Sequence, residues 1–274
     1  MINLTDYDKF KISYNLANSL VSKVDLSKGS FYAKKCDQDE AFRELIGCYV
    51  FDIIGIKCPK YHFIENEKCV ISEDLNVLSN FQCIGDISSI KELIKSRKII
   101  TLNVVKDLLT NMVNNKDEIA LQINLMHFID MLFSNVDRHI YNYGISIDEN
   151  NNGCLVVFDN GLFLDYFDKI VKPPSTINVK YPKVRCGECE FFIKNLSLEH
   201  KKIIYEIFCR FTPYNVSLMF DKIEKEYNHK FSFKNKLLIN YTRNYFMLYK
   251  LINMYINNSI KKSVNIEMSL VKKN

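Results

Sequence analysis

The pattern of apolar residues changes near residue 77, and this change constrains the fold more than any other feature of the chain. Before it, aromatic and apolar runs predict a strand over 29–36 and a hairpin that joins 61–64 to 68–72. Between them, apolar residues at helical spacing predict a helix over 39–54, with Asp37 or Asp39 as its N-cap. Gly55 is expected to end this helix. The first part therefore reads as short strands around one helix.

After residue 77 the pattern becomes mainly helical. Helices are predicted over 87–94, 102–113 and 117–133, and further helices alternate from about residue 197 to residue 260. Two short strands, 143–147 and 154–159, interrupt them and are joined by a turn-rich segment, while 171–184 reads as a polar loop. The sequence thus predicts an α+β fold of two lobes: a small β-rich lobe over 1–76 and a larger, mainly helical lobe over 77–274.

Composition narrows the class of protein. A hydrophobic fraction of 47% and a charged fraction of 25% are typical of a globular chain, and a net charge of +5 without a basic cluster argues against nucleic-acid binding. No apolar run approaches the roughly 20 residues that a membrane helix needs. The polar, acidic start lacks the features of a secretory signal, so we expect a cytoplasmic protein. An effector exported by a specialised machine would have the same start, and this alternative stays open.

The nine cysteines mostly stand singly in apolar stretches, which favours free thiols in a reducing compartment over a disulfide framework. The exception is the pair Cys186 and Cys189, separated by two residues. One such pair supplies only two of the four ligands that structural zinc usually takes. We interpret it as an unmetallated loop, with half of an intermolecular metal site as the alternative. His127, on the apolar helix, is interpreted as a core histidine.

The stretch from 134 to 161 has the residues that phosphoryl transfer requires. Asp137 and Asn142 lie five positions apart after the longest apolar helix, and Asp159 follows the second strand of the predicted hairpin. One carboxylate can orient an acceptor hydroxyl and take its proton, while an amide oxygen and a second carboxylate suit Mg²⁺. Gly161 would let the backbone turn sharply beside the metal. Each residue alone is also common in turns, so it is their joint order and spacing that favours catalysis.

The pattern Asp137-Arg138-His139-x-x-Asn142, followed by Asp159-x-Gly161, resembles the catalytic and metal-binding loops of HipA-like kinases. It is also similar to the phosphoinositide-kinase-like superfamily and to the secretory-pathway kinases. The resemblance implies a protein-kinase-like fold with Asp137 as the catalytic base and with Asn142 and Asp159 as Mg²⁺ ligands. Arg138 and His139 would shape the loop rather than react.

The first lobe supports the same resemblance, which covers roughly residues 28 to 165. A strand that ends in Lys34 and Lys35 precedes a helix that contains Glu44, like the lysine–glutamate pair that holds nucleotide phosphates in kinases. Either lysine could act, and Lys34 is preferred. Glu73 and Leu75 fall in a segment similar to the interlobe hinge, whose backbone binds adenine. The phosphate-binding loop would lie within 19–29, which is poor in glycine.

These features predict an ATP- and Mg²⁺-dependent phosphotransferase, with a serine/threonine protein kinase of the HipA-like type as the leading hypothesis. Its partner would be a protein substrate with a Ser or Thr acceptor. Two alternatives stay open: a lipid or small-molecule kinase of the same fold, for which the basic residues between 169 and 185 would suit phosphoinositides, and a nucleotide-binding pseudokinase. A lesser hypothesis is autophosphorylation at Ser27 or Ser30.

Overall fold

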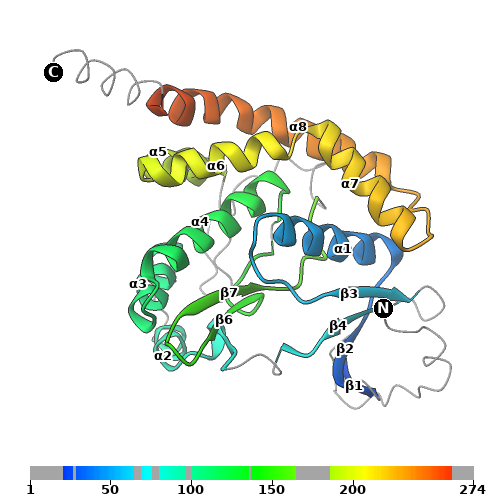
Figure 1. Ribbon diagram of the computed structural model, residues 1–274, viewed down its shortest axis with the longest axis horizontal. Coiled ribbons are helices and arrows are strands. Elements are labelled where there is room, and N and C mark those ends of the chain that lie inside the picture. Colours follow the sequence, from blue (N-terminus) through cyan, green and yellow to red (C-terminus); the bar gives the residue numbers. More distant parts are fainter. Residues whose placement is uncertain are drawn as a thin grey trace.

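The computed structural model describes residues 21–26, 29–64, 69–75, 80–96, 100–135, 137–164 and 186–260. Its first part is an antiparallel sheet of four strands in the order β1-β2-β4-β3, with helix α1 packed beside it (Figure 1). The elements of this part are β1 (Val21–Leu26), β2 (Gly29–Lys35), α1 (Gln38–Ile53), β3 (Tyr61–Ile64) and β4 (Cys69–Glu73). The predicted strands and the predicted helix are all confirmed.

The second part is mainly helical and carries a small antiparallel sheet in the order β5-β6-β7. Its first elements are β5 (Gln82–Cys83), a 3₁₀ turn (Ile84–Asp86), α2 (Ser88–Lys95), α3 (Leu102–Met112), α4 (Lys116–Leu132), β6 (Tyr143–Ile147) and β7 (Gly153–Val157). The remaining elements are α5 (Cys186–Asn195), α6 (Leu198–Arg210), α7 (Pro213–Glu226), α8 (Lys234–Ile252) and a π-helical turn, η4 (Asn253–Asn257). The predicted α+β architecture with a β-rich part and a helical part is confirmed.

The ends of α1 follow from its sequence. The Asp37 side chain accepts a hydrogen bond from the Glu40 N–H at 2.8 Å, which satisfies one of the free donors of the first turn. At the other end Gly55 has a φ of +74°, a left-handed conformation that glycine adopts without penalty. The chain then runs past β7, where the Val157 N–H donates to the Lys57 carbonyl at 2.9 Å. This bond joins the first part of the chain to the small sheet.

The structure differs from the sequence analysis at three places. Residues 21–26 form β1, where no strand was predicted, paired in register with β2 from Val21–Lys34 to Leu26–Gly29. The phosphate-binding loop expected within 19–29 stays a prediction, because residues 19, 20, 27 and 28 lie outside the described residues. Cys186 and Cys189 begin helix α5 rather than lying in a loop. A left-handed conformation near the predicted metal site, which was not predicted, is that of Asp159, with a φ of +55°.

Several other expectations fall outside the described residues. These are the polar loop at 171–184, the basic residues between 169 and 185, and Ser27. The predicted boundary at 76 and 77 also lies there, within 76–79, and stays a prediction. Among the residues that the structure describes, no helix combines the length and apolar character needed to cross a bilayer.

His127 is buried in α4, with its ring edge-on to Phe192 at a centroid distance of 4.6 Å. Burial lowers the pKa of His127 to about 4 from its ordinary value of 6.5. Below pH 6.5 the unfolded chain therefore binds a proton that the folded chain does not, and stability is lost as the pH falls toward 4. The difference of about 2.5 pK units corresponds to roughly 3 kcal/mol.

We expect His127→Gln to flatten the pH dependence of the unfolding free energy between pH 6.5 and 4, measured by urea denaturation at several pH values. His62 and His200, whose pKa values burial also lowers, stay in place as a common background. An unchanged pH profile in the variant would show that His127 takes no part in acid destabilisation.

Candidate active site

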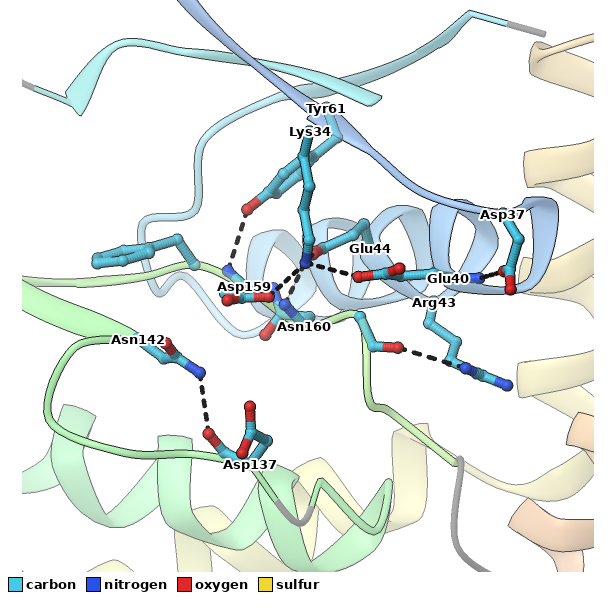
Figure 2. A network of polar contacts seen from close by, with 12 residues as sticks. Lys34, Asp37, Glu40, Arg43, Glu44, Tyr61, Asp137, Asn142, Asp159 and Asn160 are labelled. Atoms are coloured by element: carbon cyan, nitrogen blue, oxygen red, sulfur yellow. Dashed lines mark hydrogen bonds and ion pairs between the residues drawn. The ribbon is translucent and has the colours of Figure 1, made fainter. Parts of the chain in front are cut away.

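Lys34 lies at the centre of a cluster of three carboxylates (Figure 2). Its Nζ is 2.9 Å from Oε1 of Glu44, 2.7 Å from Oδ1 of Asp159 and 2.8 Å from Oε1 of Glu40. Lys34 comes from β2 and the two glutamates lie one turn apart on α1, whereas Asp159 follows β7. Two consecutive elements of the first part of the chain and a segment more than 100 residues further on therefore meet at one ammonium group.

The charges in this cluster do not balance. Burial would lower the pKa of Lys34, but attraction to Glu44 and Asp159 outweighs it and raises that pKa above its ordinary range. Burial also raises the pKa of Glu44 to about 7, although Lys34 opposes this. The raised pKa values of Lys34 and Glu44 are consistent with each other, because one ammonium cannot fully compensate three carboxylates. The charged form of Glu44 is disfavoured most, because this side chain is fully buried.

The Glu44 carboxylate accepts hydrogen bonds from both sides of the site. Its Oε1 accepts from Lys34, and its Oε2 accepts from the backbone N–H of Asn160 at 2.7 Å. The side chain is completely buried, so both of its oxygens must be satisfied within the protein. Glu44 thus fixes the distance between the lysine strand and the segment that carries Asp159.

Asp159 is held in an uncommon backbone conformation. Its φ of +55° lies in the left-handed region, which costs an aspartate less than most residues. The Asp159 N–H donates to the Tyr61 hydroxyl at 3.1 Å, and Lys34 holds the pKa of the carboxyl below its ordinary value, against the effect of burial. The Asp159 side chain keeps 43% of its surface exposed, so an ionised oxygen is accessible to a ligand.

Asp137 and Asn142 lie on the loop that follows α4. The Asn142 amide nitrogen donates to the Asp137 carbonyl oxygen at 2.9 Å, which leaves the amide oxygen as the group that could bind a metal. The Asp137 N–H donates to Oδ1 of Asn135 at 3.1 Å. Figure 2 shows the Asp137 carboxylate pointing toward the segment that carries Asp159 and Asn160. The side chain is 34% exposed, so an acceptor hydroxyl can reach it.

Arg138, which forms a buried ion pair with Asp130 of α4, connects this loop to the Asp159 segment. Arg138 donates through Nε to Oδ2 of Asp130 at 3.0 Å, and through Nη2 to Oδ1 of Asn160 at 2.7 Å. Its Nη1 donates to the carbonyls of Asn142 at 3.0 Å and Phe158 at 2.8 Å. These contacts agree with the expectation that Arg138 shapes the loop. His139 lies nearby, with Nε2 3.9 Å from Oδ2 of Asp137.

The other predicted residues lie at the edge of the site or away from it. Lys35 is exposed and is paired in register with Cys69, while Lys34 is the lysine that contacts Glu44. Glu73 is the exposed last residue of β4, and Leu75 is half-buried just after it. Their place in a hinge segment whose backbone would bind adenine stays a prediction.

Sequence reasoning missed four residues of the site: Asp130, Glu40, Tyr61 and Asn160. Asp130 is an acidic residue within a densely apolar helix, and such a residue needs a buried partner. That signal could have identified it. Glu40, Tyr61 and Asn160 have ordinary helix, strand and turn contexts, so only their contacts in space connect them to the site.

The donor set fits Mg²⁺. An exposed carboxylate oxygen of Asp159 and the amide oxygen of Asn142 are ligands that this ion prefers, and Mg²⁺ normally takes its remaining ligands from water and phosphate. Within the described part of the chain, His, Cys, Asp and Glu side chains form no group of three or more that could hold a metal by themselves. The two protein oxygens of Asp159 and Asn142 would leave the remaining Mg²⁺ positions to phosphate and water.

Helix α1 approaches the Asp159 segment so closely that only glycine fits at position 47. A Cβ added to Gly47 would lie 2.3 Å from Cβ of Asn160. Helix propensity alone predicts that Gly47→Ala stabilises the helix by roughly 0.5–1 kcal/mol. We expect the opposite, a loss of about 1–3 kcal/mol from overpacking, measured by urea denaturation. Equal or greater stability in the variant would contradict the close approach.

No protein-family model matches this sequence, and no curated protein matches it. Solved structures do. The proinflammatory kinase CtkA of Helicobacter pylori superposes with a TM-score of 0.61 at 17% identity, over 91% of this chain and 95% of CtkA. HipA of the Shewanella oneidensis MR-1 toxin–antitoxin system superposes with a TM-score of 0.57 at 10% identity, over 88% of this chain.

The chain spans 65% of the length of that HipA chain. At these identities the likeness concerns the fold alone, and it agrees with the resemblance drawn from the residues around Asp137 and Asp159. The chain has a protein-kinase-like fold, which it shares with CtkA and HipA.

Proposed function

We propose that this chain is a phosphotransferase that uses ATP and Mg²⁺. The observation that carries the proposal is the meeting of Lys34, Glu44 and Asp159 within hydrogen-bonding distance, although they come from three separate segments. The loop with Asp137 and Asn142 is joined to the same segment, because the Phe158 N–H donates to the Asn142 carbonyl at 3.0 Å. Groups of these kinds in one site meet the main needs of phosphoryl transfer.

Each residue has a distinct role in this proposal. Lys34, oriented by Glu44, binds phosphate oxygens of the nucleotide, and the backbone of the segment with Glu73 and Leu75 binds the base. Asp159 and Asn142 hold Mg²⁺, which neutralises phosphate charge when bound. Asp137 orients the acceptor hydroxyl and accepts its proton. Phosphate oxygens would compete with Asp159 and Glu40 for the hydrogens of Lys34.

For the acceptor we propose a Ser or Thr hydroxyl of a protein. The support for this choice is the likeness of the fold and of the loop sequence to HipA-like kinases. A panel of acceptors separates it from its alternatives: label on protein from γ-labelled ATP supports a protein kinase. Label on inositol lipid vesicles alone would instead indicate a lipid kinase, and ATP binding without any transfer would indicate a pseudokinase.

The two neighbouring lysines provide a matched test of the site. Lys34→Ala removes the group that contacts Glu44 and Asp159, whereas Lys35→Ala changes an exposed side chain of the same strand. We expect Lys34→Ala to reduce phosphoryl transfer by about 10²-fold or more, as is usual when a preorganised charge is removed. Lys35→Ala should retain transfer. Equal rates in the two variants would contradict the assignment of Lys34 to the phosphates.

A further inference from the structure

The turn between α7 and α8, residues 227–233, lies against α1 and β3 (Figure 1). The Phe231 ring stacks on Phe42 of α1, with centroids 4.2 Å apart and planes inclined by 16°. Phe42 also lies edge-on to Phe220 of α7, at 5.3 Å. All three rings are buried. Aromatic packing of this kind fixes the first-lobe helix to the C-terminal helices.

A second connection leads from the same turn to Asp159. The Tyr227 hydroxyl donates to the Tyr61 carbonyl oxygen at 2.7 Å. The Tyr61 hydroxyl in turn accepts from the Asp159 N–H at 3.1 Å. Tyr61 is buried, so these hydrogen bonds are protected from water. One residue of β3 therefore links the turn to the segment with the predicted metal ligand.

The turn itself is built around a buried carboxylate. Oε1 of Glu224 accepts from the Phe231 N–H at 2.9 Å, and Oε2 accepts from Lys230 at 3.1 Å and from Lys234 at 2.5 Å. The His229 N–H donates to the Glu224 carbonyl oxygen at 3.0 Å. Because Glu224 is only 4% exposed, these bonds hold the turn in one conformation.

The turn and the candidate active site face opposite sides of α1. Phe42 and Glu44 are two residues apart, which places them about 200° apart around the helix axis. Phe42 contacts the turn, and Glu44 contacts Lys34 and Asn160. Helix α1 is therefore packed between the two, and a shift of α1 toward the turn would pull Glu44 away from Lys34.

We propose that the 227–233 turn is a positioning element for phosphoryl transfer. Phe231 acts through Phe42 and α1 on Glu44, and Tyr227 acts through Tyr61 on Asp159. Both are positioning residues that touch neither nucleotide nor acceptor. The inference rests on the proposed function for its catalytic consequence, but the fixing of α1 is a separate physical claim that does not need activity to be tested.

The first test measures amide hydrogen exchange in α1. Phe231→Ala should speed exchange of the α1 amides by about tenfold or more relative to wild type, because the helix loses its packed partner. Phe208→Ala is the matched control: Phe208 is equally buried and stacks on Tyr245 at 4.4 Å, within the C-terminal helices. The control should leave α1 exchange as in wild type. Equal exchange of α1 in both variants would overturn the proposal.

The second test measures kinetics. Phe231→Ala should lower kcat by about tenfold in the wild-type background. It should have little further effect on kcat when Glu44 is already replaced by glutamine, because the effects of coupled residues are non-additive. A loss of kcat through general destabilisation would instead be the same in both backgrounds and would overturn the proposal.

A further variant, Tyr227→Phe, removes only the hydroxyl and should lower kcat by a few-fold. It is the variant to measure if Phe231→Ala does not fold. An unchanged kcat in Tyr227→Phe would overturn the route through Tyr61.

These tests separate the two proposals. Wild-type protein that transfers no phosphate to any acceptor would refute the proposed function. The exchange measurement would still decide whether the 227–233 turn fixes α1, since it needs no turnover.

Discussion

Replacing Asp130 by alanine is expected to destabilise the protein by about 3–5 kcal/mol, which is the usual loss when one partner of a buried ion pair is removed. The Asp130 and Arg138 side chains are 5% and 6% exposed, and the guanidinium would be left buried without a counterion. Arg138 also donates hydrogen bonds to the carbonyls of Asn142 and Phe158. Its displacement would therefore disturb both the loop after α4 and the segment after β7. Urea denaturation with a common slope would measure the loss.

The matched control for this prediction is an exposed pair. Lys91 contacts Asp86 at 3.0 Å, with both side chains at least half exposed. Asp86→Ala should therefore cost less than about 1 kcal/mol. Combining Asp130→Ala with Arg138→Met should recover part of the lost stability, since the unpaired charge is gone. A loss for Asp130→Ala no larger than that for Asp86→Ala would contradict the structural role of the buried pair.

Replacing Asp137 by asparagine is expected to lower kcat by about 10²–10⁴-fold, the usual contribution of a positioned general base. The substitution preserves size and keeps the backbone bonds to Asn135 and Asn142. Because Asp137 is assigned to the acceptor and not to the nucleotide, the affinity for ATP should be retained. Single-turnover transfer and equilibrium ATP binding, measured on the same preparation, would separate these two quantities.

Asp148→Asn provides the matched control for Asp137→Asn. Asp148 is exposed in the β6–β7 turn, where its carboxylate accepts the Asn152 N–H at 2.7 Å. The same chemical change there should leave kcat unaltered. If Asp137→Asn retained the wild-type kcat, Asp137 would not be the base, and proton transfer would have to be assigned to another group.

Much of the fold could be predicted because its elements carry local signals. The Asp37 cap and Gly55 bracket α1, and the apolar spacing of α4 identified a buried helix. Strand β1 was missed because its sequence, VSKVDL, contains only three apolar residues and gains its structure from pairing with β2. Helix α5 was missed because the pair Cys186 and Cys189 at its start was interpreted as part of a loop.

The candidate site was predictable where residue type and spacing along the chain carry the chemistry, as for Asp137 and Asn142. The choice between Lys34 and Lys35 needed the strand register, which decides which side chain faces α1. Tyr61 and Gly47 could not be found, since their roles depend on distances to the segment with Asp159 and Asn160, far away in the sequence. Glu40 is close to Lys34 in the sequence, but its contact with Lys34 depends on how α1 packs beside β2. The contact of Phe231 with Phe42 could not be predicted either, because the two residues lie in opposite halves of the chain.

The most direct test of phosphoryl transfer compares wild-type protein with Asp159→Asn. Both are incubated with γ-labelled ATP and Mg²⁺, label is scored on protein, lipid vesicles and small molecules, and ATP binding is measured in parallel. We predict label on a protein acceptor from the wild type, and transfer slower by about 10³-fold in Asp159→Asn with its weakened metal ligand. Equal transfer by both proteins, or ATP binding by the wild type without transfer to any acceptor, would contradict the proposal.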